Sequence, residues 1–545
     1  MSVRFSIALV VASAVSACGG AVPDSSSSSS SSAGVIALDT GPVHGTQENG
    51  VWAYLGIPYA APPVGALRWE APQPPVRWET PLDASAFGAA CVQVLPNVPV
   101  PVGQEDCLTA NVWAPPSATP ASPRPVLVFI HGGGNVEGWT GQRGEGTGRG
   151  ALGFGENSPQ YDGAALAAKE NVMVVTFNYR LGPFGFLALP AFGANAGNYG
   201  LRDQIFALGW AKRNAAAFGG DATRVLLFGH SSGAADACDL VASPMANGLF
   251  SAVIVESGVC IAAPATVAHS FAQSWAQKAG CGSASDVAAC LRTLDPYAVA
   301  LVQPETPDIG SGARIDYQPS VDGAVLPDAP LQIIRTGRHN HVPLVFGSNS
   351  DETALSVARA HPQGMTVEEY ASNLPALVGD DPTLASELLA LYPASDYATP
   401  LEAYIQATTD RIQTSGATLG ACMAATGQTD APVWRYFFTH HLDNGTALEK
   451  MMGAWHGEEL AFVFRHLRAS DYTPSEGEQT LTDAIENDWA SIAASGVPVS
   501  SPAWPRYVPS TDPYVQLDDT VTTGAGLRTK KVQFWNRVTG RPPCP

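Results

Sequence analysis

Short, unbroken apolar runs recur along the chain and alternate with stretches that have helical spacing. Runs of this length, rich in Val, Ile and Leu and without polar alternation, are typical of strands buried on both faces of a parallel sheet. Strand and helix in alternation predict an α/β fold, with a large, mostly parallel central sheet flanked by helices. The predicted strands are residues 125–130, 172–177, 225–228, 252–255 and 342–346, and the predicted helices are residues 163–169, 201–218 and 268–279.

The rest of the chain follows this pattern less regularly. Residues 34–123 are rich in turns and Pro, with short strand-like pieces at 51–54 and 110–113, and residues 365–427 are helical and irregular. There is neither a clear linker nor an internal repeat. We therefore predict one large domain over residues 34–545, with long insertions.

Seven glycines crowd residues 141–155. The segment lacks the GK[ST] ending of a phosphate-binding loop and does not run from a strand into a helix. We expect a surface loop, which would act as a lid if it covers a pocket.

The first residues have the pattern of an export signal. Arg4 precedes an apolar run over residues 5–17, which is too short to span a bilayer. The run ends in Val-Ser-Ala before Cys18, which resembles a lipobox, and a run of serines follows that cannot bury apolar surface. The predicted segments are a lipoprotein-type signal peptide over residues 1–17, a lipid-carrying Cys18 and a serine-rich tether over residues 18–33.

On this interpretation the protein is exported and lipid-anchored to a bacterial outer membrane or cell surface. The alternative is an ordinary cleaved signal peptide and a secreted or periplasmic protein.

Composition and charge exclude several kinds of partner. The chain has 545 residues, of which 45% are hydrophobic and 14% charged, as in globular proteins rather than in disordered chains. With 29 Lys and Arg against 49 Asp and Glu, the net charge is −20. Nucleic-acid binding needs clustered cations, and an anionic membrane surface repels such a chain. We expect neither as a partner, so that any membrane link is through the N-terminal anchor.

The chain contains nine cysteines. Setting Cys18 aside leaves eight, an even number that predicts disulfides in an exported protein, although spacing alone cannot pair them. Paired CxxC motifs and clusters of His and Cys with zinc-site spacing are absent from the sequence, and we expect no metal or organic cofactor. The eight are Cys91, Cys107, Cys238, Cys260, Cys281, Cys290, Cys422 and Cys544.

The third predicted strand ends in the motif G-x-S-x-G, with Ser231 at its centre. A nucleophile on a sharp turn from strand to helix needs small neighbours two residues away, which explains Gly229 and Gly233. The motif alone is a weak signal. Here a buried strand precedes it and a helical pattern over residues 234–241 follows, so that Ser231 is the candidate nucleophile.

A serine nucleophile needs a base, an acid that orients the base, and N–H donors for the oxyanion. Three glycines after His131 end another predicted strand and offer backbone N–H groups, and the N–H of Ser232 is a further candidate donor. Of the 11 histidines, His456 stands out in the sequence Trp-His-Gly-Glu-Glu, downstream of the nucleophile. Nothing in the sequence raises four others above surface or buried structural residues, namely His44, His269, His339 and His341.

Six stretches of the chain match the signature sequences of one enzyme family in the right order. They are residues 105–112 (EDCLTANV), 178–186 (NYRLGPFGF), 197–204 (GNYGLRDQ), 218–233 (from FGGD to GHSSG), 321–323 (VDG) and 534–536 (FWN). The chain thereby resembles the type-B carboxylesterases, the α/β-hydrolase family that includes cholinesterases and bacterial para-nitrobenzyl esterases. The resemblance covers essentially everything from residue 34 onward and implies the α/β-hydrolase fold.

The resemblance implies a role for each candidate. Ser231 falls on the nucleophile, Glu352 on the acid and His456 on the base, in the chain order Ser, Glu, His of α/β-hydrolases. Asp351 precedes Glu352, and composition cannot choose between the two carboxylates; the family uses the second. The residues that match the oxyanion hole are Gly133, Gly134 and Ser232.

The resemblance also implies structural links. It gives the ion pairs Arg68–Glu105 and Arg180–Asp203, which belong to the scaffold. It further implies the disulfides Cys91–Cys107, Cys281–Cys290 and Cys422–Cys544, and we pair Cys238 with Cys260 by elimination.

Three departures from the family bear on the substrate. His230 replaces a Glu that usually precedes the nucleophile, so that a source of negative charge near the substrate is missing. The loop between Cys91 and Cys107 has no aromatic residue, whereas the choline site of cholinesterases uses a Trp there. Asn135 replaces an aromatic residue common after the three glycines. Cationic choline esters are therefore poor candidates.

We expect a serine carboxylesterase that hydrolyses neutral, small-molecule carboxylic esters through an acyl-enzyme. One alternative is a lipase or polyester hydrolase of the same fold, which chain-length dependence would separate. Another is a non-catalytic adhesion module, against which the preserved Ser231, Glu352 and His456 argue.

Overall fold

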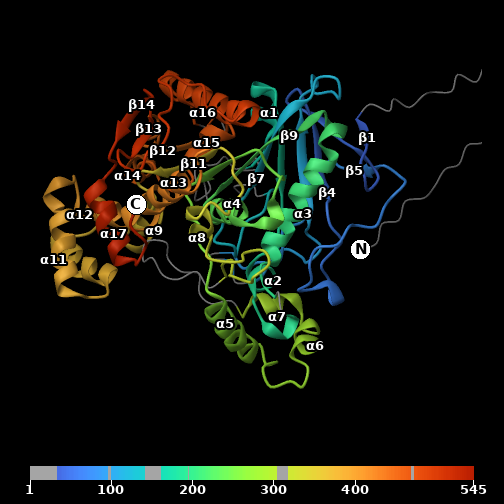
Figure 1. Cartoon of the computed structure of the whole chain (residues 1–545), viewed down its shortest axis with the longest axis horizontal. Helices are drawn as coiled ribbons and strands as arrows, with labels where there is room; N and C mark the ends of the chain where they lie inside the picture. The colour runs from blue at the N-terminus through green and yellow to red at the C-terminus, as the bar shows by residue number, and fades with distance from the viewer. Residues whose placement is uncertain are drawn as a thin grey trace, which may run out of the picture. The chain divides into compact units, whose positions relative to one another are not determined.

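Eleven strands form one mixed sheet at the centre of the protein (Figure 1). The computed structural model describes residues 34–95, 98, 100–141, 161–193, 196–302, 317–467 and 472–544. In spatial order the strands are β14 (Thr522–Ala525), β13 (Pro513–Leu517), β12 (Val433–Phe438), β11 (Leu344–Asn349), β10 (Ala252–Glu256), β9 (Gly220–His230), β7 (Arg124–Ile130), β8 (Met173–Phe177), β6 (Thr109–Ala114), β4 (Val51–Pro58) and β3 (Thr46–Glu48). A separate small sheet contains β1 (Val35–Ala37), β2 (Pro42–His44) and β5 (Leu82–Asp83).

The strands from β13 to β8 pair in parallel, and the strands at both ends of the sheet pair antiparallel. The predicted mostly parallel sheet is thus confirmed, and each of the five predicted apolar runs overlaps a strand; the runs at 172–177 and 342–346 begin one and two residues before β8 and β11. The sequence pattern missed β12, β13 and β14, which complete the sheet on the C-terminal side.

The central strands are buried on both faces, which explains why their sequences show no polar alternation. In β7, Val128 belongs to one hydrophobic core and Phe129 to the other. Leu227 and Phe228 divide in the same way in β9, because successive side chains of a strand point to opposite faces. Each strand therefore contributes to two cores at once.

Helices cover both faces of the sheet (Figure 1). Residues of α3, α4 and α13 belong to the first core, and residues of α1 and α16 to the second. The predicted helices correspond to α1, α3 and α5. The helices are α1 (Ala164–Glu170), α2 (Gly182–Phe186), α3 (Tyr199–Asn214), α4 (Ser232–Ala242), α5 (Ala265–Lys278), α6 (Val287–Arg292), α7 (Pro296–Ala300), α8 (Pro330–Arg335), α9 (Ala354–Ala360), α10 (Val367–Asn373), α11 (Pro382–Leu391), α12 (Pro400–Thr409), α13 (Ser415–Gly427), α14 (Ala447–Met452), α15 (Glu459–Val463), α16 (Glu476–Ser495) and α17 (Thr529–Val538).

A third hydrophobic core lies outside the sheet, among α9, α10, α11, α12 and α17. Figure 1 shows α11, α12 and α17 grouped beside the edge of the sheet that β12, β13 and β14 form. A π-helical turn over Asp410–Thr414 joins α12 to α13. This is the segment whose sequence is helical but irregular.

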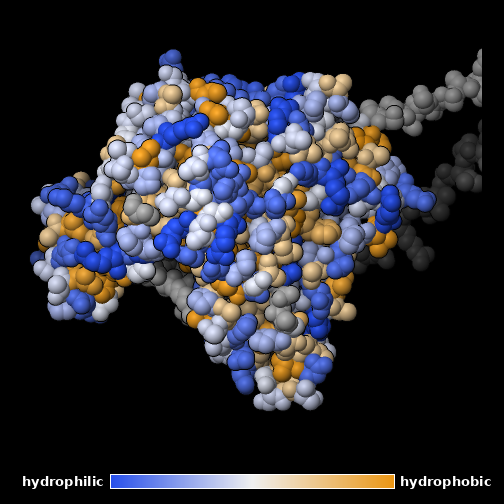
Figure 2. Space-filling view, viewed as in Figure 1, coloured by the Kyte–Doolittle hydropathy of each residue, from blue (hydrophilic) through white to orange (hydrophobic). Residues whose placement is uncertain are grey.

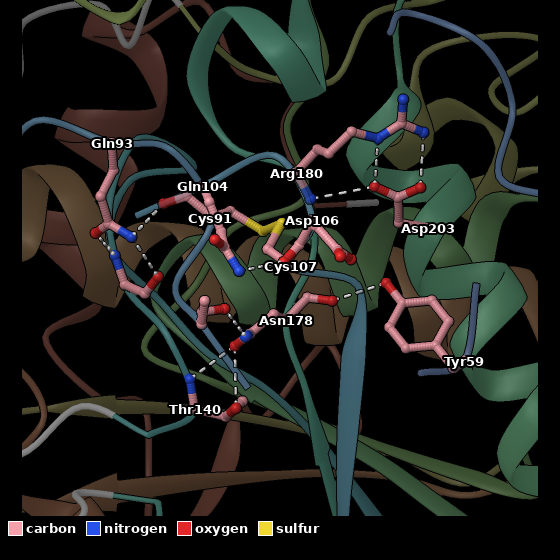
Figure 3. Close-up of a disulfide and its surroundings, with 12 residues drawn as sticks. Tyr59, Cys91, Gln93, Gln104, Asp106, Cys107, Thr140, Asn178, Arg180 and Asp203 are labelled. Carbon is pink, nitrogen blue, oxygen red and sulfur yellow. Dashed lines mark hydrogen bonds and ion pairs between the residues drawn. A yellow bond between two sulfur atoms is a disulfide. The ribbon is translucent and has the colours of Figure 1, made fainter. Parts of the chain in front are cut away.

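Two ion pairs link segments beside the sheet, and Figure 3 shows one of them, Arg180–Asp203. Arg180 donates two side-chain hydrogen bonds of 2.7 Å to the carboxylate of Asp203, and its backbone N–H donates a third. Arg68 forms a similar two-bond pair with Glu105, at 2.6 Å for each bond. Both ion pairs implied by the family resemblance are present, and in each pair both carboxylate oxygens accept from the Arg side chain, as expected of scaffold residues.

The eight described cysteines form four disulfides. Two of these close short loops, with sequence separations of 16 and 9, and two join more distant segments, with separations of 22 and 122. The pairs are Cys91–Cys107, Cys281–Cys290, Cys238–Cys260 and Cys422–Cys544.

Two expectations fall on residues that the structure does not describe. Cys18, with the rest of residues 1–33, lies outside the described residues, and so does the glycine-rich segment after Gly141, up to residue 160. Among the described helices, none combines the length and apolarity needed to cross a bilayer. On the face shown in Figure 2, hydrophilic and hydrophobic residues are intermixed.

Candidate functional site

Ser231 lies on the sharp turn between β9 and α4. Its backbone has φ 59° and ψ −124°, a conformation rare for residues with a side chain. The turn also needs two glycines: a Cβ on Gly229 would lie 2.5 Å from the carbonyl oxygen of Gly233, and a Cβ on Gly233 only 2.2 Å from that of Ile130. The N–H of Ser231 donates a 3.0 Å hydrogen bond to the carbonyl of Glu256, the last residue of β10. The predicted strand–turn–helix context of the motif is present.

Three open N–H groups lie on the segments around Ser231. Gly133 and Gly134 follow β7 with φ values of 112° and 63°, which favour glycine. The loop approaches the serine closely, since a Cβ on Gly132 would lie 2.9 Å from the Cβ of Ser231. Within the described residues, nothing accepts a hydrogen bond from the N–H of Gly133, Gly134 or Ser232. Preorganised free donors of this kind can stabilise a developing oxyanion.

His456 and Glu352 form a hydrogen-bonded pair. Glu352 lies just after β11, and His456 lies in the loop between α14 and α15. Nδ1 of His456 is 2.6 Å from Oε2 of Glu352, and the N–H of Asn349 donates to Oε1 of the same carboxylate at 2.8 Å. Glu352 is only 2% exposed. A carboxylate held in this way fixes both the tautomer and the orientation of the imidazole.

His456 contacts the turn at Ser231 through His230, the residue before the serine. The ring centroids of His230 and His456 are 4.4 Å apart. Nε2 of His456 makes no hydrogen bond with any described residue, Ser231 included. In unliganded sites the bond between nucleophile and base is often long and tightens only when substrate binds. The free Nε2 is the atom that a base would present to the serine.

Asp351 has a different set of partners from Glu352. Its carboxylate accepts hydrogen bonds from the N–H of Ala454, at 3.1 Å, and from the side chain of Gln406, at 2.7 Å. The backbone N–H of Asp351 in turn donates to the carbonyl of Ala454 at 3.0 Å. Asp351 therefore anchors the loop that leads to His456 and does not contact the imidazole.

Two buried carboxyl groups, Glu352 and Glu459, act on the imidazole of His456. Glu459 accepts hydrogen bonds from Ser257 and Asn349, and burial together with the nearby charge of Glu352 raises its pKa to about 7. Burial would lower the pKa of His456, but its hydrogen bond to Glu352 and the charges of Glu352 and Glu459 raise it above the ordinary value. Glu459 was not among the residues predicted for the site, although it lies only three residues after His456 in the sequence.

His230 is a neutral neighbour of this group. Burial and the proximity of His456 hold the pKa of His230 well below its ordinary value. Its Nε2 lies 3.7 Å from Oε1 of Glu459, too far for a hydrogen bond. The position before Ser231 therefore carries a neutral side chain at neutral pH.

The other histidines lie in different environments. Nε2 of His339 is hydrogen-bonded to Gln428, and Nδ1 of His341 to Asp430, so neither lies in the group around Ser231. Among the described residues, the side chains of His440, Asp518 and Asp519 are close enough together to share a metal ion. Burial would lower the pKa of His440, but hydrogen bonds to Asp518 and Glu478 raise it to about 10.

Comparison with known proteins places the chain within one family. The sequence model of the carboxylesterase family matches residues 32–535. The chain is 35% identical to para-nitrobenzyl esterase of Bacillus subtilis, over 92% of this chain and 98% of the relative. It is 32% identical to human cocaine esterase, over 91% and 89% of the two chains, and 30% identical to acetylcholinesterase of Danio rerio, over 93% and 88%.

Solved structures agree with the sequence comparison. A PNB esterase superposes with a TM-score of 0.75 at 34% identity, covering 92% of this chain and 99% of the other. A thermophilic PNB esterase gives the same TM-score at 32% identity, with the same coverage. The α/β-hydrolase fold predicted from the sequence is confirmed.

Proposed function

The chain belongs to the carboxylesterase family and is a carboxylic ester hydrolase, and from this premise we propose that it acts through an acyl-enzyme on Ser231. One observation carries the proposal: Glu352 holds the imidazole of His456 at 2.6 Å, while His230, the residue before Ser231, contacts the same imidazole. Ser231, Glu352 and His456 lie on the segments that follow β9, β11 and β12. Ser231 would be the nucleophile, Glu352 the orienting acid and His456 the base.

In the proposed reaction, Oγ of Ser231 attacks the ester carbonyl carbon and its proton passes to Nε2 of His456. The negative charge that forms on the carbonyl oxygen is stabilised by the N–H groups of Gly133, Gly134 and Ser232. Collapse of this intermediate breaks the ester C–O bond, and His456 returns the proton to the leaving alcohol. A water molecule, deprotonated by His456, then attacks the acyl-enzyme and releases the carboxylic acid.

The proposed substrates are neutral esters of small molecules. The neutral state of His230 supports this, because no carboxylate at that position attracts a cationic alcohol group. The loop between Cys91 and Cys107 also lacks an aromatic ring that could hold a quaternary ammonium.

The test combines active-site labelling with a substrate panel. We expect a fluorophosphonate probe to label Ser231, as peptide mass spectrometry would show, and p-nitrophenyl acetate to be hydrolysed. Within the panel, uncharged esters should be cleaved more efficiently than choline esters of the same size. Absence of labelling on a folded protein that also hydrolyses no ester of the panel would contradict the proposal.

Esterase activity should fall as the pH drops through a value above the ordinary histidine pKa of 6.5. Only the neutral form of His456 accepts the proton of Ser231, and Glu352 raises the pKa of that imidazole, so the protonated, inactive form persists to a higher pH. A profile of kcat/KM between about pH 5 and 9 measures the midpoint. A midpoint clearly below that of free histidine would contradict a raised pKa of His456.

A further inference from the structure

Asn135, the residue after the three glycines, is locked in place by its backbone. Its φ is 60°, a left-handed conformation that Asn tolerates better than most residues. Its N–H donates to Oγ of Ser232 at 3.1 Å, and its carbonyl accepts a 2.6 Å hydrogen bond from the N–H of Gly182. The residue is 3% exposed. One backbone thus joins the glycine loop both to α4 and to the start of α2.

The side chain of Asn135 makes two more links. Its Nδ2 donates to Oδ1 of Asp236, at 3.1 Å, one turn along α4 from Ser232. Its Oδ1 accepts from the hydroxyl of Tyr179 at 3.1 Å, and the same hydroxyl lies 2.9 Å from the carbonyl oxygen of His131. The side chain therefore reaches α4 and, through Tyr179, the other end of the glycine loop.

Asp236, on α4 after the turn at Ser231, completes this network. It is fully buried, and its second oxygen accepts a hydrogen bond from Nε2 of Gln204 on α3. Burial raises the pKa of Asp236 to about 7, and the two amide donors oppose that rise. Burying a carboxyl group costs free energy unless hydrogen bonds offset it, and here the side-chain amides of Asn135 and Gln204 supply those bonds. The position of the Asp236 side chain therefore depends on both donors.

We propose that the Asn135–Asp236 hydrogen bond is a positioning device for the oxyanion hole: it fixes the N–H groups of Gly133 and Gly134 relative to the N–H of Ser232. The inference rests on the proposed function, since it assigns no reaction of its own. The two walls of the hole come from segments about 100 residues apart, as the 97-residue separation of the Asn135–Ser232 contact shows. Asn135 joins these walls directly, and neither Asn135 nor Asp236 contacts the reacting atoms.

The expected effect appears in the chemical step. Displacing an oxyanion donor by about 1 Å costs on the order of 10²-fold in rate, because the donors act only when charge develops on the oxygen. Ground-state binding of the ester needs no such alignment. Disturbing the bridge should therefore lower kcat and leave KM nearly unchanged.

Reversing the polarity of the bridge tests the proposal. Asn135→Asp is assayed at about pH 9, above the raised pKa of Asp236, so that two carboxylates face each other. We expect kcat for p-nitrophenyl acetate to fall about 10- to 100-fold relative to the parent at the same pH, with KM within about threefold. Adding Asp236→Asn should restore kcat to within about fivefold of the parent, because Nδ2 of the new amide donates to the new carboxylate while its Oδ1 still accepts from Gln204. Active-site titration with a phosphonate normalises every rate to functional enzyme.

Asn214→Asp is the matched control. Asn214 is another buried Asn that donates to an Asp, here Asp39, at the far end of α3. The Asn214→Asp substitution should destabilise the protein without changing kcat per titrated active site. If Asn135→Asp does not fold, Asn135→Gly decides, because Gly keeps the left-handed backbone and both backbone bonds and removes only the side-chain bonds to Asp236 and Tyr179.

Three outcomes overturn the inference. The first is that Asn135→Asp keeps kcat within about threefold of the parent, and the second is that Asn135→Gly does so. The third is that the double variant folds but is as slow as Asn135→Asp. A parent enzyme with neither ester turnover nor labelling of Ser231 would instead overturn the proposed function, and this inference with it.

Discussion

Ser231→Ala is expected to lower kcat by at least about 10³-fold while the protein stays folded. Alanine cannot form the acyl-enzyme, and the residual rate reflects only the oxyanion hole and substrate binding. Alanine can occupy the backbone conformation of Ser231 about as well as serine can, so that the turn between β9 and α4 should survive. Steady-state hydrolysis of p-nitrophenyl acetate and a thermal melt of the same sample measure the two effects.

Ser251→Ala is a suitable control for this experiment. The hydroxyl of Ser251 accepts a 2.9 Å hydrogen bond from the N–H of Val225, in the middle of β9 and six residues before Ser231. It should cost some stability and no activity. A folded Ser231→Ala protein that kept most of its esterase activity and still reacted with the fluorophosphonate probe would require another nucleophile.

Glu352→Gln should reduce kcat on the order of 10³-fold or more, with the fold intact. An amide can present an N–H where the imidazole N–H must donate, which favours the wrong tautomer, and it carries no charge to stabilise the imidazolium. Because the charge of Glu352 also raises the pKa of His456, any residual activity should extend to lower pH. Rate and pH profile together distinguish this role from simple loss of stability.

Asp351→Asn is the neighbouring comparison. An amide keeps one acceptor for the N–H of Ala454 but weakens the anchor of the His456 loop, so we expect a lower melting temperature and a much smaller loss of kcat. If the large kinetic loss falls on Asp351→Asn while Glu352→Gln stays near the parent, the two roles have to be exchanged.

The sequence predicts the parallel centre of the sheet well and its C-terminal side poorly, for a physical reason. Strands buried on both faces stand out as apolar runs. Strand β12 is equally buried, but its apolar run is interrupted by Arg435, which is 0% exposed and is paired at 2.7 Å with Asp512 just before β13. A charged residue that a distant partner neutralises cannot be recognised from local pattern.

The same limit applies to the site. The small residues around Ser231 reveal a tight turn, because steric demand is local and readable in sequence. The choice between Asp351 and Glu352 depends on which side chain faces His456, more than 100 residues away. In the sequence, Asn135 is notable only because it replaces an aromatic residue common in the family. The role proposed for it depends on its hydrogen bond to Asp236, which is 101 residues away along the chain.

The Cys422–Cys544 disulfide has a consequence for proteolysis. It closes a loop that contains His456, whereas Ser231 lies outside that loop. A cut at an exposed site within the loop, such as between Asp443 and Asn444, would separate the base from the nucleophile in sequence. The two pieces would nevertheless remain one covalent molecule, and the cut would appear on a denaturing gel only after reduction.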